Sequence, residues 1–167
     1  MGKENMNQFN DFTSMKKMQG MGYKMFGIMM VVSFIIMYGV MFLNVDNSSH
    51  IYLSTTRTYM SLLMVSSMAA VMLLMMGKMY PNKKINVAII FTAIFIFILA
   101  LTGLRTQTPI GDVQYMKAMI PHHSSAIMVS KHANIQDPEV KKLSEGIIAS
   151  QEKEIAEMKS ILQRIEK

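Results

Sequence analysis

Residues 25–43, which read MFGIMMVVSFIIMYGVMFL, form a run of 19 residues without a charged side chain. Two similar runs follow, YMSLLMVSSMAAVMLLMMG at 59–77 and INVAIIFTAIFIFILALTGL at 85–104. As a helix, each run would be about 28 to 30 Å long, which is the thickness of the hydrocarbon core of a bilayer. We therefore predict an all-α protein that crosses a lipid bilayer three times.

Basic residues are distributed unevenly around these runs. The loop 44–58 contains only two charged residues, Arg57 and Asp46. Lysines precede the first run and fill the turn between the second and third, at Lys3, Lys16, Lys17, Lys24, Lys78, Lys83 and Lys84. Because lysine-rich loops stay in the cytoplasm, we expect residues 1–24 to be cytoplasmic. The C-terminal region is then extracytoplasmic, on the outer side of the cell membrane, which is the inner membrane in a bacterium.

The net charge of +6 belongs entirely to the membrane part of the chain. Residues 1–111 carry nine basic and three acidic side chains, and residues 112–167 carry eight of each. Such an excess is typical of topology signals rather than of nucleic-acid binding, so nucleic acid is not expected as a partner. The chain has no cysteine, which excludes disulfides and thiolate metal sites.

The chain divides into four parts by composition. A segment 1–24 precedes a membrane domain, 25–104, and the residues 105–111 form a linker to an outer domain, 112–167. The turn between the second and third runs is short, so these two spans are expected to form a tight antiparallel hairpin.

The outer domain is predicted to be a soluble helical hairpin. Asp112 suits the N-cap of a helix that extends to about Ala133, and a break is expected at or just before Pro121, which lacks a backbone N–H. Asp137 and Pro138 suit the N-cap and first residue of a second helix. A hairpin of about 55 residues buries little apolar surface. We therefore expect two copies to pair into a four-helix bundle, as a homo-oligomer, or the hairpin to pack against other protein.

Methionine is the outlier of the composition, at 21 of 167 residues. In the outer domain it occurs together with histidine, and the pairs Met119/His123 and Met128/His132 each share a helix face. The candidate metal ligands are Met116, Met119, His122, His123, Met128 and His132 of the first helix and Met158 of the second. A straight first helix cannot bring its six candidates to one ion. A shared site needs a kink, Met158 or a second subunit.

Thioether and imidazole ligands together suit copper as Cu(I), and by the same softness silver as Ag(I). A structural interpretation of the same residues stays open, in which methionine fills the core and histidine lies at the surface. The methionines of the second span, which recur every three or four residues, also have two interpretations. They either pack between helices or guide Cu(I) toward the outer domain.

The outer domain carries a specific pattern, Met119-Ile-Pro-His122-His123-x-x-Ala-Ile-Met128, followed later by Ser150-Gln-x-x-Glu-Ile-x-x-Met158. This pattern resembles the bacterial family catalogued as domain of unknown function family 305, over residues 112–167. The resemblance implies ferritin-like helical architecture and the binding of copper or silver outside the cytoplasm. The positions that match the family are Met119, His122, His123, Met128 and Met158.

The ferritin-like resemblance also raises a di-iron alternative. That alternative needs paired carboxylates and Glu-x-x-His sequences, yet no Glu-x-x-His occurs and residues 113–133 contain no acidic side chain. No hydrolase triad pattern or His-Glu-x-x-His is present either, so we expect no enzyme. We predict a membrane-anchored protein that sequesters copper or passes it to copper-handling partner proteins. The alternatives are a structural or interaction protein and a subunit of a metal transporter.

Overall fold

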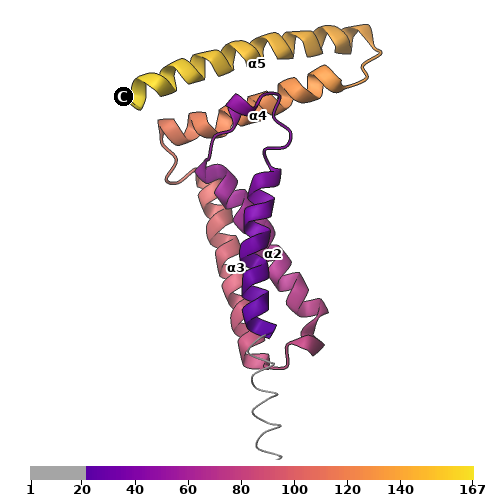
Figure 1. The fold of residues 1–167 in the computed structure, drawn as a ribbon, viewed down its shortest axis with the longest axis vertical. Coiled ribbons are helices and arrows are strands. Elements are labelled where there is room, and N and C mark those ends of the chain that lie inside the picture. The colour runs from indigo at the N-terminus through magenta and orange to yellow at the C-terminus, as the bar shows by residue number, and fades with distance from the viewer. Residues whose placement is uncertain (1–21) are drawn as a thin grey trace, which may run out of the picture. The chain divides into compact units, whose positions relative to one another are not determined.

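The computed structural model describes residues 22–167, and every regular element in this range is helical, as the all-α prediction requires (Figure 1). An N-terminal helix, Gly22–Val40, precedes the 3-10 turn η1 (Ser48–His50). The further elements are α2 (Thr55–Met75), the turn η2 (Gly77–Met79), α3 (Lys83–Thr106), α4 (Asp112–His132) and α5 (Pro138–Ile165). Most of the predicted cytoplasmic segment 1–24 lies outside the described residues.

Three of these helices are long and apolar enough to cross a membrane, which confirms the predicted spans. They are Gly22–Val40, α2 and α3, with 19, 21 and 24 residues. Many of their apolar side chains are exposed, including Leu74 at 73% and Phe91 at 69%. A soluble protein rarely exposes so much apolar surface, so these faces suit contact with lipid.

The helix ends differ from the predicted ends by two to four residues. The predicted spans contain no charged residue, whereas Lys24, Lys83 and Arg105 all lie inside helices. Helix ends are set by backbone hydrogen bonding and not by hydrophobicity. Helix α3 ends where Gln107 adopts a left-handed φ of 54°, so the linker comprises 107–111 and not 105–111.

One compact unit consists of the N-terminal helix up to Ile36 together with residues 62–100. The Tyr23 hydroxyl donates a hydrogen bond to Asn86 Oδ1 at 2.7 Å. The ring of Tyr80 lies 5.3 Å from that of Tyr23 and 5.6 Å from that of Phe26, measured between ring centres. These contacts give the unit an aromatic cluster near the turn between α2 and α3.

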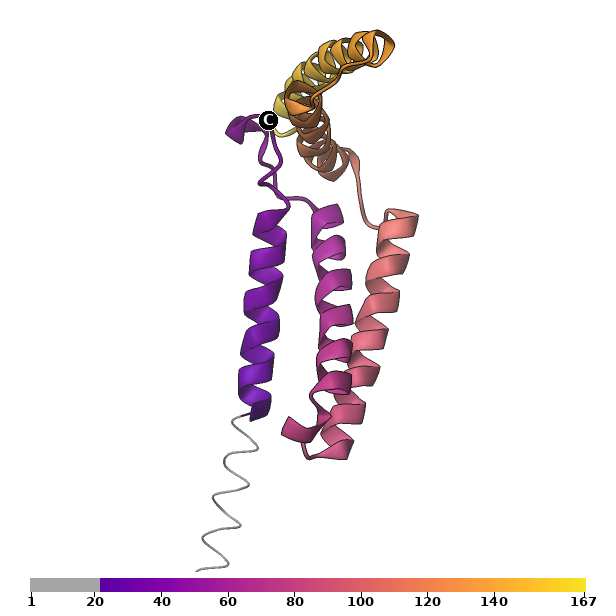
Figure 2. The same ribbon diagram turned by 90° about the vertical axis from the view of Figure 1, so that its right-hand side faces the viewer.

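Helices α2 and α3 run antiparallel within this unit and are joined by the short turn containing η2 (Figure 2). The predicted hairpin is therefore present. A cavity of about 240 Å³ is lined by side chains of both helices, among them Val65, Ala69, Ile89 and Ala93. The packing is looser than the tight hairpin that we expected.

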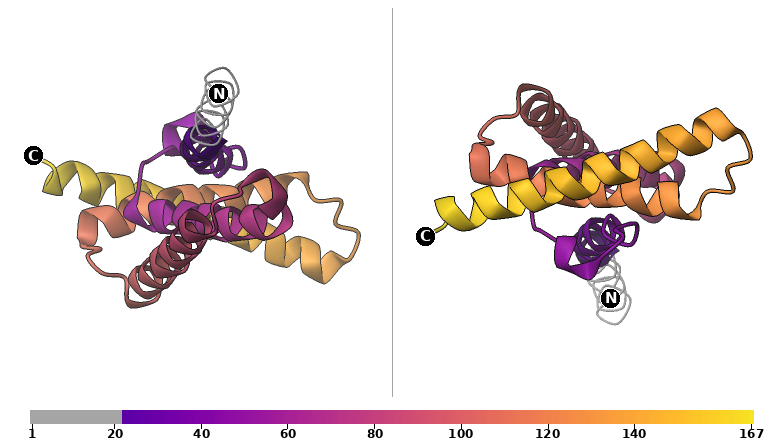
Figure 3. Two further views of the ribbon diagram at one scale, coloured as in Figure 1. Left: turned by 90° about the horizontal axis from the view of Figure 1, so that it is seen from below. Right: turned by 90° about the horizontal axis from the view of Figure 1, so that it is seen from above.

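The second compact unit combines residues 37–61 with residues 101–167. Its largest part is the antiparallel pair α4 and α5, which lie side by side along the whole of α4 (Figures 1 and 3). The segment 44–54 between the first two spans, with η1, also packs in this unit. The predicted division of the chain places this segment in the membrane domain, as a connection.

The predicted break at Pro121 is wrong, because α4 continues through this residue. Proline removes its own hydrogen bond to the carbonyl of residue 117 and crowds that carbonyl, but the side chain of Pro121 is fully buried. Burial of this side chain offsets the lost bond. The predicted N-cap also moves by one residue, since Gly111 occupies the N-cap and Asp112 lies in the first turn.

The start of α5 is as predicted. Asp137 is the N-cap, and its Oδ1 accepts hydrogen bonds from the backbone N–H groups of Glu139 at 2.8 Å and Val140 at 3.0 Å. Pro138 occupies the first turn, where its missing N–H costs nothing. This cap fixes where the chain turns back to run beside α4.

Candidate functional site

The contact between α4 and α5 is built from side chains three and four residues apart, the spacing that keeps one face of each helix toward its partner. Ile120 and Ile127 of α4 are 0% and 1% exposed, and Ile155 and Leu162 of α5 are 4% and 3% exposed. We call this contact the seam. It is the hydrophobic core of the second unit.

Two polar side chains interrupt the seam. His123 of α4 and Gln151 of α5 follow the same spacing as the buried isoleucines. The Nδ1 atom of His123 and the Oε1 atom of Gln151 are both buried, and neither has a hydrogen-bond partner among residues 22–167. An unpaired buried polar atom costs about 1–3 kcal/mol. The seam therefore contains polar groups that packing alone does not require.

His123 Nδ1 lies 3.1 Å from Glu154 Oε2, which is an ion-pair distance if the imidazole is protonated. The same atoms do not meet the angles of a hydrogen bond. Burial lowers the pKa of His123, the carboxylate of Glu154 opposes this shift, and His122 adds to it. Near neutral pH the imidazole is therefore uncharged, which is the form that binds metal ions.

Thioether side chains lie along the same seam. Met116 is 5% exposed and belongs to the core, and Met158 of α5 packs against that core. The seam thus carries one neutral imidazole and two thioethers from the predicted ligand set, those of Met116 and Met158, and both helices contribute to it. Met119 is half-buried and lies one helical turn before His123, but it is not part of this core.

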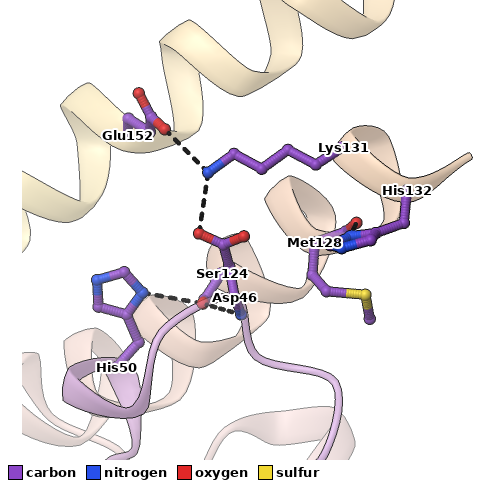
Figure 4. A network of polar contacts seen from close by, with 7 residues as sticks. All are labelled: Asp46, His50, Ser124, Met128, Lys131, His132 and Glu152. Atoms are coloured by element: carbon purple, nitrogen blue, oxygen red, sulfur yellow. Dashed lines mark hydrogen bonds and ion pairs between the residues drawn. The ribbon is translucent and has the colours of Figure 1, made fainter.

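The other three predicted ligands are separate from this group. His122 is exposed and lines a cavity that none of the seam residues lines. Met128 and His132 lie on a further side of α4, where His132 Nδ1 donates a hydrogen bond to the carbonyl oxygen of Met128 at 2.9 Å (Figure 4). That bond leaves Nε2 of His132 as the nitrogen able to accept. A single copy of α4 therefore does not bring its six candidate ligands to one metal ion. Using all six would need a second copy of the chain or a second ion.

A polar network joins the segment 44–54 to the hairpin (Figure 4). The backbone N–H of Asp46 donates to Ser124 Oγ at 2.9 Å, and His50 Nδ1 lies 2.9 Å from the same oxygen. Lys131 Nζ donates to Asp46 Oδ2 at 3.0 Å and lies 3.5 Å from Glu152 Oε1. The network ties the segment to both α4 and α5, and it covers one side of the hairpin.

His50 is the one histidine of the chain that is not among the predicted ligands. Burial lowers its pKa, and nearby Lys159 and Lys131 lower it further, against the opposing effect of Asp46. His50 lies in the connection between the first two spans and not in α4. Helical spacing therefore could not show that it lies near α4. In the part of the chain that the structure describes, no three His, Asp or Glu side chains cluster to hold a metal ion. A site here would depend on methionine sulfur.

The comparisons with known proteins cover both parts of the chain. The family model described as domain of unknown function (DUF305) matches residues 100–167. An uncharacterized protein of Acanthamoeba polyphaga mimivirus is 39% identical over 145 residues, which cover 85% of this chain and 93% of the viral one. The chain belongs to the family of this viral protein. No solved structure matches the chain.

The DUF305 region confirms the resemblance of the outer domain and extends it. The match begins at residue 100, within α3, and so includes the linker as well as both helices of the hairpin. The viral relative aligns with 85% of the chain, more than the DUF305 region alone, so that relationship includes much of the membrane part. The relative comes from a virus and does not support the bacterial origin that we expected.

Proposed function

We propose that the protein is a membrane-anchored metal-binding protein that holds Cu(I), or Ag(I), at the outer face of a membrane, without catalysis. It would sequester the ion or pass it to copper-handling partner proteins. The observation that carries this proposal is His123, whose buried Nδ1 atom has no hydrogen-bond partner among the described residues. Such a costly group calls for an explanation, and the position of a metal ligand supplies one.

The donors in and beside the seam fit a soft ion. The uncharged imidazole of His123 offers a nitrogen lone pair, and Met116, Met119 and Met158 offer thioether sulfur. Mg²⁺ and Ca²⁺ want oxygen ligands, whereas Cu(I) and Ag(I) favour sulfur and imidazole. When bound, the ion would remain in a largely apolar seam that limits its exchange with solvent. Met128 and His132, which lie apart from the seam, would serve a second ion or a second copy of the chain.

The hairpin leaves one side open. The segment 44–54 covers the side that carries Ser124 and Lys131, and the other side exposes Tyr115 at 54%, Leu143 at 64% and Ile147 at 36%. By helical periodicity Tyr115 lies on the same face of α4 as Met119, four residues later. A second copy packed here would complete a four-helix bundle and bring two such sites together. This open side also suits a structural or interaction protein, in which the histidines only pack.

Metal titration of the full chain in detergent separates these functions. We expect Ag(I), in competition with a chelator of known affinity, to bind the parent protein. The variant His123→Asn should bind at least about tenfold more weakly, because it loses a ligand. The matched control His50→Gln also removes one imidazole from the same unit and should bind as the parent does. If His123→Asn binds as tightly as the parent, the seam histidine is structural, and the interaction function is preferred.

A further inference from the structure

A cavity of about 330 Å³ lies within the second unit, outside the seam. Its lining comes from three segments: residues 41–44 after the N-terminal helix, the first turns of α2, and α4. The polar residues that line it are Asn44, Thr56, Arg57, His122 and Ser125. No acidic side chain is part of this lining.

Arg57 is held in place without a counter-ion. Its guanidinium carbon lies 4.3 Å from the centre of the Phe42 ring, and Nη1 donates to the carbonyl oxygen of Met41. Within residues 22–167, no carboxylate forms an ion pair with it. A guanidinium has five N–H donors in a fixed planar fork that matches the oxygens of carboxylate or phosphate. The cavity therefore contains a positioned cation with donors to spare.

The neighbouring side chains supply further donors. Ser125 Oγ accepts a hydrogen bond from Asn44 Nδ2 at 2.7 Å, so its own hydroxyl hydrogen is free to be donated. Thr56 and His122 add a hydroxyl group and an imidazole. The first turn of α2 has no acidic residue, so the positive end of that helix adds to the charge of Arg57.

We propose that this cavity binds a phosphate group through Arg57, with His122 and Ser125 as further donors. A phospholipid headgroup is the expected source. Arg57 lies in the first turn of a membrane span, at the level where a bilayer places its phosphates. Leu43 and Leu53, in the adjoining segment, are 80% and 69% exposed, which suits contact with lipid. The positive charge of Arg57 opposes a metal ion here, so His122 has a different role from His123.

Native mass spectrometry of the full chain in detergent, titrated with phosphatidylglycerol, tests this proposal. We expect Arg57→Gln to bind about 10- to 100-fold more weakly, the effect of losing a charge-assisted hydrogen bond. Arg105→Gln is the matched control, because Arg105 is exposed in the last turn of α3, at the end of another span. That variant should bind as the parent does. A parallel titration with inorganic phosphate identifies the source: binding of lipid alone indicates the headgroup, and Arg57-dependent binding of inorganic phosphate alone indicates the free ion.

Arg57→Gln also removes the hydrogen bond to the Met41 carbonyl, and weaker binding could then result from local unfolding. A second variant, at His122, tests the cavity without removing this bond. His122 is exposed, and we expect His122→Gln to weaken phosphate binding at least about threefold while helicity by circular dichroism stays that of the parent. Equal loss in Arg57→Gln and Arg105→Gln would indicate only a general interfacial charge and would overturn the proposal. Unchanged binding in Arg57→Gln and His122→Gln would overturn it as well.

Discussion

Replacing His123 by Leu should stabilise the protein while removing its proposed metal site. The substitution takes away a buried Nδ1 without a hydrogen-bond partner, which costs about 1–3 kcal/mol. It also fills the seam between Ile120 and Ile127 with an apolar side chain. The contact that is lost, with Glu154, is weak, because the pKa of His123 is lowered and the Glu154 side chain is 46% exposed. The net expectation is a gain of about 1–2 kcal/mol in the free energy of unfolding.

The assay is thermal unfolding of the full chain in detergent, followed by circular dichroism without added metal. A gain of 1 kcal/mol raises Tm by about 4–8 °C in a unit of 60–100 residues. The control Ile127→Ala should lower the free energy of unfolding by about 2–5 kcal/mol, since Ile127 is 1% exposed in the same seam. If His123→Leu melts at a lower temperature than the parent, His123 stabilises the seam, and the functional argument from its missing hydrogen bond fails.

Three further predictions concern pH, assembly and topology. Burial lowers the pKa of both His50 and His123, so below about pH 6.5 the unfolded state binds more protons than the folded state. We therefore expect Tm to fall as the solution is acidified below that pH. A Tm that rises on acidification would contradict these shifts. Sedimentation of the full chain in detergent should show a dimer that Leu143→Glu dissociates, because a carboxylate on the open side cannot be buried without a partner; a parent that is monomeric at every concentration would exclude pairing through this side. Protease added to the outside of intact cells should remove residues 112–167, and cleavage only in inverted membrane vesicles would reverse the topology.

The helices could be predicted from the sequence because their signals are local. A span is recognised by a charge-free run of sufficient length, and the start of α5 by the neighbouring residues Asp137 and Pro138. Pro121 misled the prediction for the same reason. Its local effect is to break a helix, but in the structure it is fully buried, and the energy of packing outweighs one lost hydrogen bond.

The contacts of the segment 44–54 could not be predicted in this way. His50 meets Ser124 across 74 positions of the sequence, and Lys131 meets Asp46 across 85. Periodicity relates residues within one helix and says nothing about which loop covers it. The candidate ligands were recognised by residue type, yet their division into seam and surface groups depends on how α5 lies on α4. The absence of a hydrogen-bond partner for His123 Nδ1 among the described residues becomes visible only once both helices are in place.

The central claim is that His123 and methionine sulfur bind a soft ion in the seam. X-ray absorption spectroscopy at the copper edge tests it most directly, on the full chain loaded with one equivalent of Cu(I) in detergent. We predict a first shell with both sulfur and imidazole nitrogen, and loss of the imidazole contribution in His123→Asn but not in His50→Gln. A shell of oxygen and nitrogen alone, or an imidazole contribution unchanged in His123→Asn, would contradict the claim.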